Sequence, residues 1–65
     1  MKLIINGETE NHDVQTLAEL LAYAQYTEST IATAVNGEFV PKEDREGCHL
    51  SDGDQIEILA PMQGG

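Results

Sequence analysis

Basic residues are scarce in this 65-residue sequence, which has 3 Lys and Arg against 12 Asp and Glu, for a net charge of -9. Nucleic acids and anionic membrane surfaces are bound mainly through clustered Lys and Arg. The composition therefore argues against both as partners. It favours solubility and fast encounter with a basic protein surface, although acidity alone is equally typical of an ordinary soluble protein.

Cysteine is nearly absent too, because Cys48 is the single one. One thiol excludes an internal disulfide and any zinc or iron–sulfur site built from several cysteines. We interpret Cys48 as a free loop thiol; the alternative, a sulfur-relay thiol, lacks a cationic cluster that would lower its pKa. His12 and His49 have no metal-ligand spacing, so we expect no metal and two solvated histidines.

Long apolar runs are also missing. Leu3-Ile4-Ile5 is too short for the apolar segment of a signal peptide, and no stretch approaches a membrane span. We therefore expect a cytoplasmic protein. A chain of 65 residues makes one small domain without room for a catalytic cleft, which favours a carrier or binding role over an enzyme. No phosphate-binding glycine pattern is present, so this chain should bind no ATP itself.

Two Asn-Gly pairs are strong hairpin signals. Asn6-Gly7 predicts that a strand over residues 1–5 returns over residues 8–13. Asn36-Gly37 predicts a second hairpin between residues 31–35 and 39–40, and the charged residues 42–47 follow with one helical turn at most. Residues 55–58 alternate polar and apolar side chains, as a half-buried strand does, which should point Ile56 and Ile58 to the core and Leu59 away.

Thr16-Leu17-Ala18-Glu19 is a capping-box pattern, and Leu17, Leu20 and Leu21 follow on one helical face. We predict a helix from about Leu17 to Gln25 that covers a sheet, with Tyr23 and Tyr26 partly in the core. The element order favours an α+β fold in which the first and last strands lie parallel, because the helical segment supplies a crossover. This is the β-grasp, or ubiquitin-like, arrangement, with a domain over residues 1–60 and a flexible tail over 61–65.

The sequence ends on Gly64-Gly65, which cannot pack a core. We predict that Gly65 presents a reactive carboxylate and that Met62, Gln63 and Gly64 thread into a narrow partner channel. Pro61 should hold the exit of the last strand extended. The alternative is a frayed terminus, which is the usual state of final residues.

Exposed apolar residues beside such a tail are typical of docking surfaces. We expect Leu59, Phe39 and Pro61 to contact a partner, while core packing of Phe39 is an equal alternative. Glu43, Asp44 and Glu46 form an acidic turn with no second catalytic group, so we expect it to be solvated.

Three segments together resemble the ThiS family, the sulfur carriers of thiamine biosynthesis. They are residues 35–42 (Val-Asn-Gly-Glu-Phe-Val-Pro-Lys), residues 50–59 with their Asp-Gly-Asp turn, and the terminal Gly64-Gly65. The opening strand and the capped helix are similar as well, so the resemblance covers essentially the whole chain. It implies a β-grasp fold.

The resemblance also implies a function. A ThiF-type adenylyltransferase would activate the Gly65 carboxylate with ATP, and a cysteine desulfurase relay would supply sulfur for a thiocarboxylate. A ThiG-type thiazole synthase would then receive that sulfur. This chain would be a protein cosubstrate, monomeric when free, and not an enzyme.

Two alternatives stay open from the residues. MoaD-type carriers of molybdopterin synthase share the Asp-Gly-Asp turn and the Gly-Gly end, and a proline at the place of Pro61 is familiar among them. The other alternative is an acidic ubiquitin-like module that binds partners without covalent chemistry.

Overall fold

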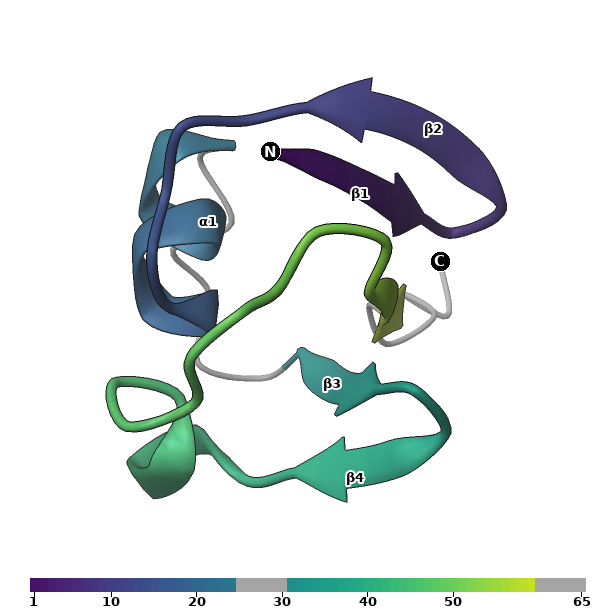
Figure 1. Ribbon diagram of the computed structural model, residues 1–65. Coiled ribbons are helices and arrows are strands. Elements are labelled where there is room, and N and C mark those ends of the chain that lie inside the picture. Colours follow the sequence, from purple (N-terminus) through teal and green to yellow (C-terminus); the bar gives the residue numbers. More distant parts are fainter. Residues whose placement is uncertain (25–30, 60–65) are drawn as a thin grey trace.

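The computed structural model describes residues 1–24 and 31–59. Five strands form one mixed sheet in the order β2-β1-β5-β3-β4, and the single α-helix of the described part lies across one face (Figure 1). The elements are β1 (Lys2–Ile5), β2 (Glu8–Asn11), α1 (Leu17–Tyr23), β3 (Ala32–Val35), β4 (Glu38–Val40), the 3-10 helix η1 (Lys42–Asp44) and β5 (Gln55–Leu59). This confirms the predicted α+β architecture.

The last strand lies at the centre of the sheet. β5 pairs with β1 in parallel and with β3 antiparallel, while β1–β2 and β3–β4 are the two antiparallel hairpins. Both hairpins turn at Asn-Gly, where Asn6 and Asn36 have φ of 51° and 54° and the glycines that follow have φ of 85° and 84°. Left-handed backbone at both central turn residues is what favours Asn-Gly there, so the turn predictions are confirmed.

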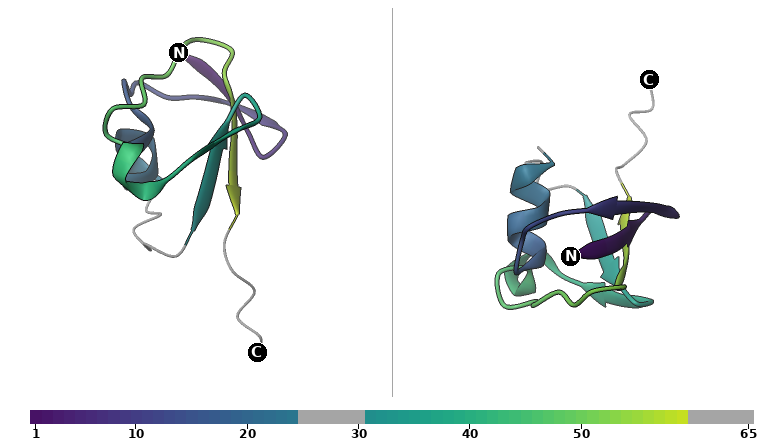
Figure 2. Two further views of the ribbon diagram at one scale, coloured as in Figure 1. Left: turned by 90° about the horizontal axis from the view of Figure 1, so that it is seen from below. Right: turned by 45° about the horizontal axis from the view of Figure 1, so that its top comes forward.

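α1 lies against one face of the sheet, as the right-hand view of Figure 2 shows, and a small apolar core fills the space between them. The helical stripe and the two isoleucines of β5 face each other in it, which confirms the predicted orientation of β5. The buried apolar residues are Leu3, Val14, Leu17, Leu20, Leu21, Ile31, Leu50, Ile56 and Ile58. α1 ends at Tyr23 with Ala24 as its C-cap, so the helix is shorter than the prediction, whose last residue, Gln25, lies outside the described residues.

The start of α1 is capped slightly differently from the prediction. Thr16 Oγ1 accepts from the backbone N–H of Glu19 at 3.2 Å, as expected for the N-cap. The Glu19 carboxylate, however, accepts from the N–H of Gln15 at 2.7 Å, one residue before the cap. Thr16 and Glu19 therefore both make capping hydrogen bonds, but the Glu19 carboxylate binds the N–H of Gln15 instead of that of Thr16.

Arg45 is buried, which the sequence did not predict, since it lies in a charged turn. Its side chain reaches under the second hairpin, where Nε donates to Thr33 Oγ1 at 3.2 Å and Nη2 donates to the carbonyl of Ile31 at 2.7 Å. Thr33 Oγ1 in turn donates to the carbonyl of Val40 at 2.7 Å. This polar network ties the turn after η1 to β3 and β4. Within the described ranges, no helix is long and apolar enough to cross a membrane.

Candidate functional site

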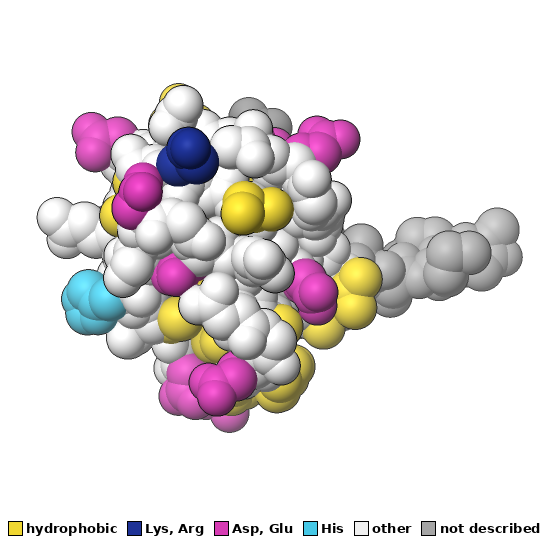
Figure 3. Space-filling view, turned by 45° about the vertical axis from the view of Figure 1, so that its right-hand side comes forward, with side chains coloured by type: hydrophobic (Ala, Val, Ile, Leu, Met, Phe, Trp, Pro, Cys, Tyr) yellow, Lys and Arg dark blue, Asp and Glu magenta, His cyan; other side chains and the backbone are white. Residues whose placement is uncertain are grey.

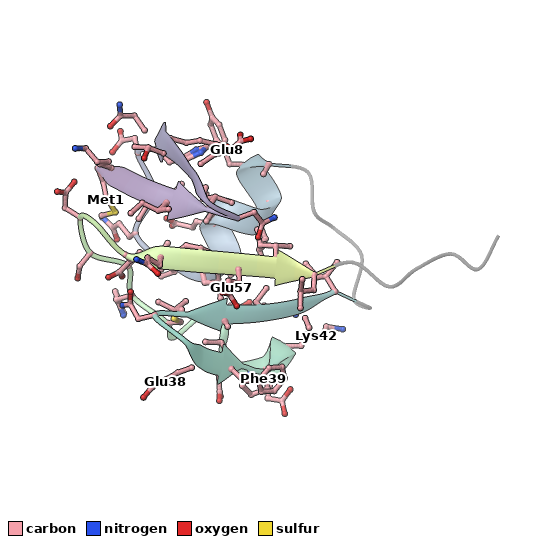
Figure 4. The ribbon with its side chains drawn as sticks, turned by 90° about the vertical axis from the view of Figure 1, so that its right-hand side faces the viewer. Met1, Glu8, Glu38, Phe39, Lys42 and Glu57 are labelled. Carbon is pink, nitrogen blue, oxygen red and sulfur yellow. The ribbon has the colours of Figure 1, made fainter. Side chains whose placement is uncertain are left out.

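The face of the sheet opposite α1 is the candidate site, and we call it the open face. Figure 4 views the molecule from this side, with β5 running across its centre. Strand alternation and cross-strand register assign its residues. They are Lys2, Ile4, Thr9, Asn11, Ala32, Ala34, Phe39, Gln55, Glu57 and Leu59.

Leu59 and Phe39 are the exposed large apolar side chains of the open face. Leu59 is 66% exposed and Phe39 is 68% exposed. Leu59 lies opposite Ala32, and Phe39 lies opposite Ala34, so two small residues of β3 lie between the rows of β5 and β4. The core alternative for Phe39 is therefore wrong. Figure 3 shows hydrophobic and acidic side chains beside each other on this part of the surface.

Both Asn-Gly turns hold β5 through the asparagine side chains. Asn6 Oδ1 accepts from the N–H of Ile58 at 2.9 Å, and Asn6 Nδ2 donates to the Ile58 carbonyl at 3.2 Å. At the other end of the strand, Asn36 Oδ1 accepts from the N–H of Gln55 at 3.0 Å and Asn36 Nδ2 donates to Asp54 at 3.0 Å. The sequence identified these residues as turn formers only, yet they also fix both ends of the strand that leads to the tail.

The predicted tail itself lies outside the described residues. This applies to Pro61 as a docking residue, to Met62, Gln63 and Gly64 as threading residues, and to Gly65 as the reactive residue. Their roles remain predictions. What the structure places is the strand that precedes them and the open face around its last residue, Leu59.

The sequence matches the family model described as "ThiS family" over residues 3–65, which is nearly the whole chain. The chain belongs to the ThiS family. This agrees with the resemblance of its motifs and with the β-grasp arrangement of the described elements.

Solved structures give the same picture of this ThiS-family chain. It is similar to the crystal structure of the thiamine biosynthesis protein ThiS from Geobacter metallireducens, at 29% identity and a TM-score of 0.84, with both chains fully covered. The NMR structure of a thiamine biosynthesis protein from Geobacter metallireducens is similar at 29% identity and a TM-score of 0.83; the match covers 100% of this chain and 88% of that one.

A curated relative is much longer. The ThiS-family chain is 38% identical over 66 residues to a thiazole synthase of Paramagnetospirillum magneticum (strain ATCC 700264 / AMB-1). The match covers 100% of this chain but 20% of that protein, so the chain spans about a fifth of the length of the curated relative it matches.

Cys48 of this ThiS-family chain is a half-buried free thiol that packs against the core. Burial raises its pKa, and the nearby carboxylates of Asp54 and Asp44 add to this rise. A thiol with a raised pKa is protonated near neutral pH and is a weak nucleophile. The environment therefore supports the interpretation of Cys48 as a free thiol and argues against a sulfur relay.

The two histidines differ. His49 is exposed, as expected. The expectation of a solvated His12 is wrong, because its side chain is only 10% exposed and its Nε2 lies 2.7 Å from a carboxylate oxygen of Glu10. Its ring meets that of Tyr23 edge-on at 5.5 Å. Tyr23 is itself 73% exposed and packs on His12 at the molecular surface, so its predicted place in the core is wrong; Tyr26 lies outside the described residues.

The acidic turn of Glu43, Asp44 and Glu46 is exposed, which confirms that it is solvated. No group of three or more His, Cys, Asp or Glu within residues 1–24 and 31–59 is arranged to hold a metal ion. Among the residues that the structure describes, the open face thus offers exposed apolar contact area around the end of β5.

Proposed function

We propose that this ThiS-family chain is the sulfur carrier of a thiamine pathway and that the carboxylate of Gly65 carries the sulfur. The observation that supports this most directly is that the family match continues to residue 65, past the end of β5. A central strand, hydrogen-bonded on both sides, leads the chain into the Gly-Gly segment. The family match also favours the thiamine pathway over the molybdopterin pathway.

The chemistry follows from the weakness of a carboxylate as an acyl donor, since its leaving group would be oxide. In the first step, the Gly65 carboxylate attacks the α-phosphate of ATP, forming an acyl-adenylate and releasing pyrophosphate. In the second, a sulfur nucleophile from a cysteine desulfurase relay attacks the acyl carbon and AMP leaves. That nucleophile is the outer sulfur of a persulfide, so the product is an acyl disulfide. A thiol then attacks the donor's sulfur and breaks the S–S bond, which leaves a thiocarboxylate at Gly65 and a disulfide between the thiol and the donor.

The partner enzymes supply the catalytic groups. A ThiF-type adenylyltransferase would bind the ATP, and a ThiG-type thiazole synthase would take the sulfur into the thiazole ring. The curated relative that contains a matching segment is named thiazole synthase, which supports the second of these partners. In this proposal the chain is a protein cosubstrate and not an enzyme.

In this proposal the tail enters the active site of the partner, and the open face docks on the partner's surface. Gly64 and Gly65 let the backbone pass where a Cβ would collide, with Met62 and Gln63 entering behind them. Pro61 keeps the exit from β5 extended. Leu59 and Phe39 offer apolar contact area to the partner, because both are more than half exposed on the same face of the sheet.

Intact mass spectrometry tests the proposal. The chain is incubated with the ThiF-type adenylyltransferase, ATP and a sulfur donor, and we expect the mass to rise by the difference between one sulfur and one oxygen. A chain without Gly65 is the control and should fold but gain no sulfur. If the full chain binds its partner and its mass never changes, the chain is a non-covalent interaction module instead. Mass analysis of the protein from its host also checks that Gly65 is the final residue.

A further inference from the structure

Glu57 lies at the centre of the open face, within the apolar surface assigned to docking. It is two residues before Leu59 on β5, and its side chain points to the same side. Across the sheet it lies opposite Ala34, which lies opposite Phe39 on the next strand. Figure 4 shows Glu57 on β5 and Phe39 on β4 in this arrangement. A partner surface that covers Leu59 and Phe39 therefore also covers Glu57.

In the described part of the structure, no ion pair joins Glu57 to a cation of this chain. The sequence has 3 Lys and Arg, and all of them lie in the described part of the structure. The ion pair present in that part joins His12 to Glu10. Arg45 donates on the core side of the sheet to Thr33 and Ile31. In the described residues, then, Glu57 is exposed and makes no ion pair.

A carboxylate that is covered by an apolar surface loses its hydration, and this is unfavourable unless a cation or several donors replace the water. Glu57 is the one acid among the open-face residues, so a partner needs a cation or donors at this one position of the interface. We propose that Glu57 binds an Arg or Lys side chain of the adenylating partner, set within the apolar surface that receives Leu59 and Phe39. This inference rests on the proposed function, which supplies that partner.

Such an ion pair would mainly determine which partner proteins the carrier binds. A protein surface with a matching apolar shape but without a cation would leave Glu57 buried and unpaired, and binding would be weak. The carrier's net charge of -9 would speed encounter with any basic surface, whereas Glu57 would decide which basic surface can dock closely.

The test measures adenylation of the carrier by the ThiF-type enzyme at increasing carrier concentration, using ATP–pyrophosphate exchange. We expect Glu57→Lys to raise KM for the carrier by at least about tenfold with little change in kcat, and Glu57→Gln to raise it by a smaller factor. Glu8→Lys is the matched control, since it changes the net charge equally. Glu8 is exposed on β2, opposite Ile5 and thus on the α1 side of the sheet, so this variant should stay within about twofold of wild type.

The outcomes separate the two proposals. If wild type is adenylated and Glu57→Lys behaves like Glu8→Lys, Glu57 has no cationic partner and this inference alone is overturned. If wild type is never adenylated, the proposed function fails and takes the inference with it. Thermal melting checks the fold of each variant. Should Glu57→Lys not fold, the nearly isosteric Glu57→Gln decides the question, and a KM equal to wild type would overturn the inference.

Discussion

The side chain of Asn6 exchanges two hydrogen bonds with the backbone of Ile58, a residue 52 positions away in the sequence. β1 ends at Ile5, and the backbone N–H of Asn6 still donates to the carbonyl of Ile56 on β5 at 2.9 Å, before the chain turns at Asn6-Gly7. The amide of Asn6 takes the place of the missing β1 peptide group, because it offers one donor and one acceptor with similar spacing. β5 is thereby held on its β1 side almost to its last residue.

Replacement of Asn6 should show what this contact contributes. Asn6→Gly keeps the left-handed backbone at φ 51° but removes both hydrogen bonds to Ile58, so we expect a loss of about 1–3 kcal/mol in the free energy of unfolding. Urea denaturation measures this. Hydrogen exchange of the Ile58 amide should speed up in the folded state, whereas amides of β3 stay protected. An unchanged exchange rate at Ile58 would contradict the assigned contact.

Leu59→Asp should separate docking from folding. Leu59 is 66% exposed, so the change should shift the free energy of unfolding by no more than about 0.5 kcal/mol. Partner binding should weaken much more, since apolar contact is lost and an unpaired charge is added. Thermal melting and titration with the adenylating enzyme measure the two effects. A collapse of thermal stability would mean that Leu59 belongs to the core.

Arg45→Met tests the buried polar network. The substitution removes the donors to the Ile31 carbonyl and to Thr33 Oγ1, and we expect a loss of about 2 kcal/mol in the free energy of unfolding. Lys42→Met is the control. It removes the same charge as Arg45→Met, but Lys42 is exposed in η1. Urea denaturation of both variants should show a clear difference. Equal stability of the two would show that the Arg45 hydrogen bonds contribute little.

The raised pKa of Cys48 gives a pH prediction. The ordinary pKa of a cysteine thiol is 9.0, and the pKa of Cys48 lies above it in the folded protein. Alkylation by iodoacetamide near pH 9 should therefore be slower in the folded than in the urea-unfolded chain. The folded state holds the proton more tightly than the unfolded state. Stability should therefore be unaffected at neutral pH and decline as the pH rises above 9.0. Cys48→Ala should remove this part of the decline and leave adenylation unchanged.

Local signals predicted most of the fold. The Asn-Gly pairs gave both hairpins, the leucine spacing gave α1, and alternation in β5 gave the inward side of Ile56 and the outward side of Leu59. These features depend on residues close together in the sequence. The helix was predicted correctly in position because its capping residues and its apolar stripe agree.

Contacts between distant segments were not predictable in the same way. The roles of Asn6 and Arg45 depend on which strand or loop lies beside them, and composition carries no information on that. Nothing near Arg45 in the sequence indicates that its side chain reaches Thr33 Oγ1 and the carbonyl of Ile31 beneath the second hairpin. The place of Glu57 beside Ala34 and Phe39 likewise depends on the register between β5, β3 and β4, which the local sequence does not fix.

The central place of β5 has a consequence for how the molecule is made. In the described part of the chain, the β1–β2 and β3–β4 hairpins do not pair with each other in the sheet, and β5, which follows both in the sequence, pairs with each of them. A nascent chain that ends before residue 55 therefore has two separate hairpins, which are marginally stable in water. The strand that closes the sheet is also the one that carries Glu57 and Leu59. A partner that binds both residues, as proposed above, would therefore meet them on a finished open face only in a chain whose sheet is complete.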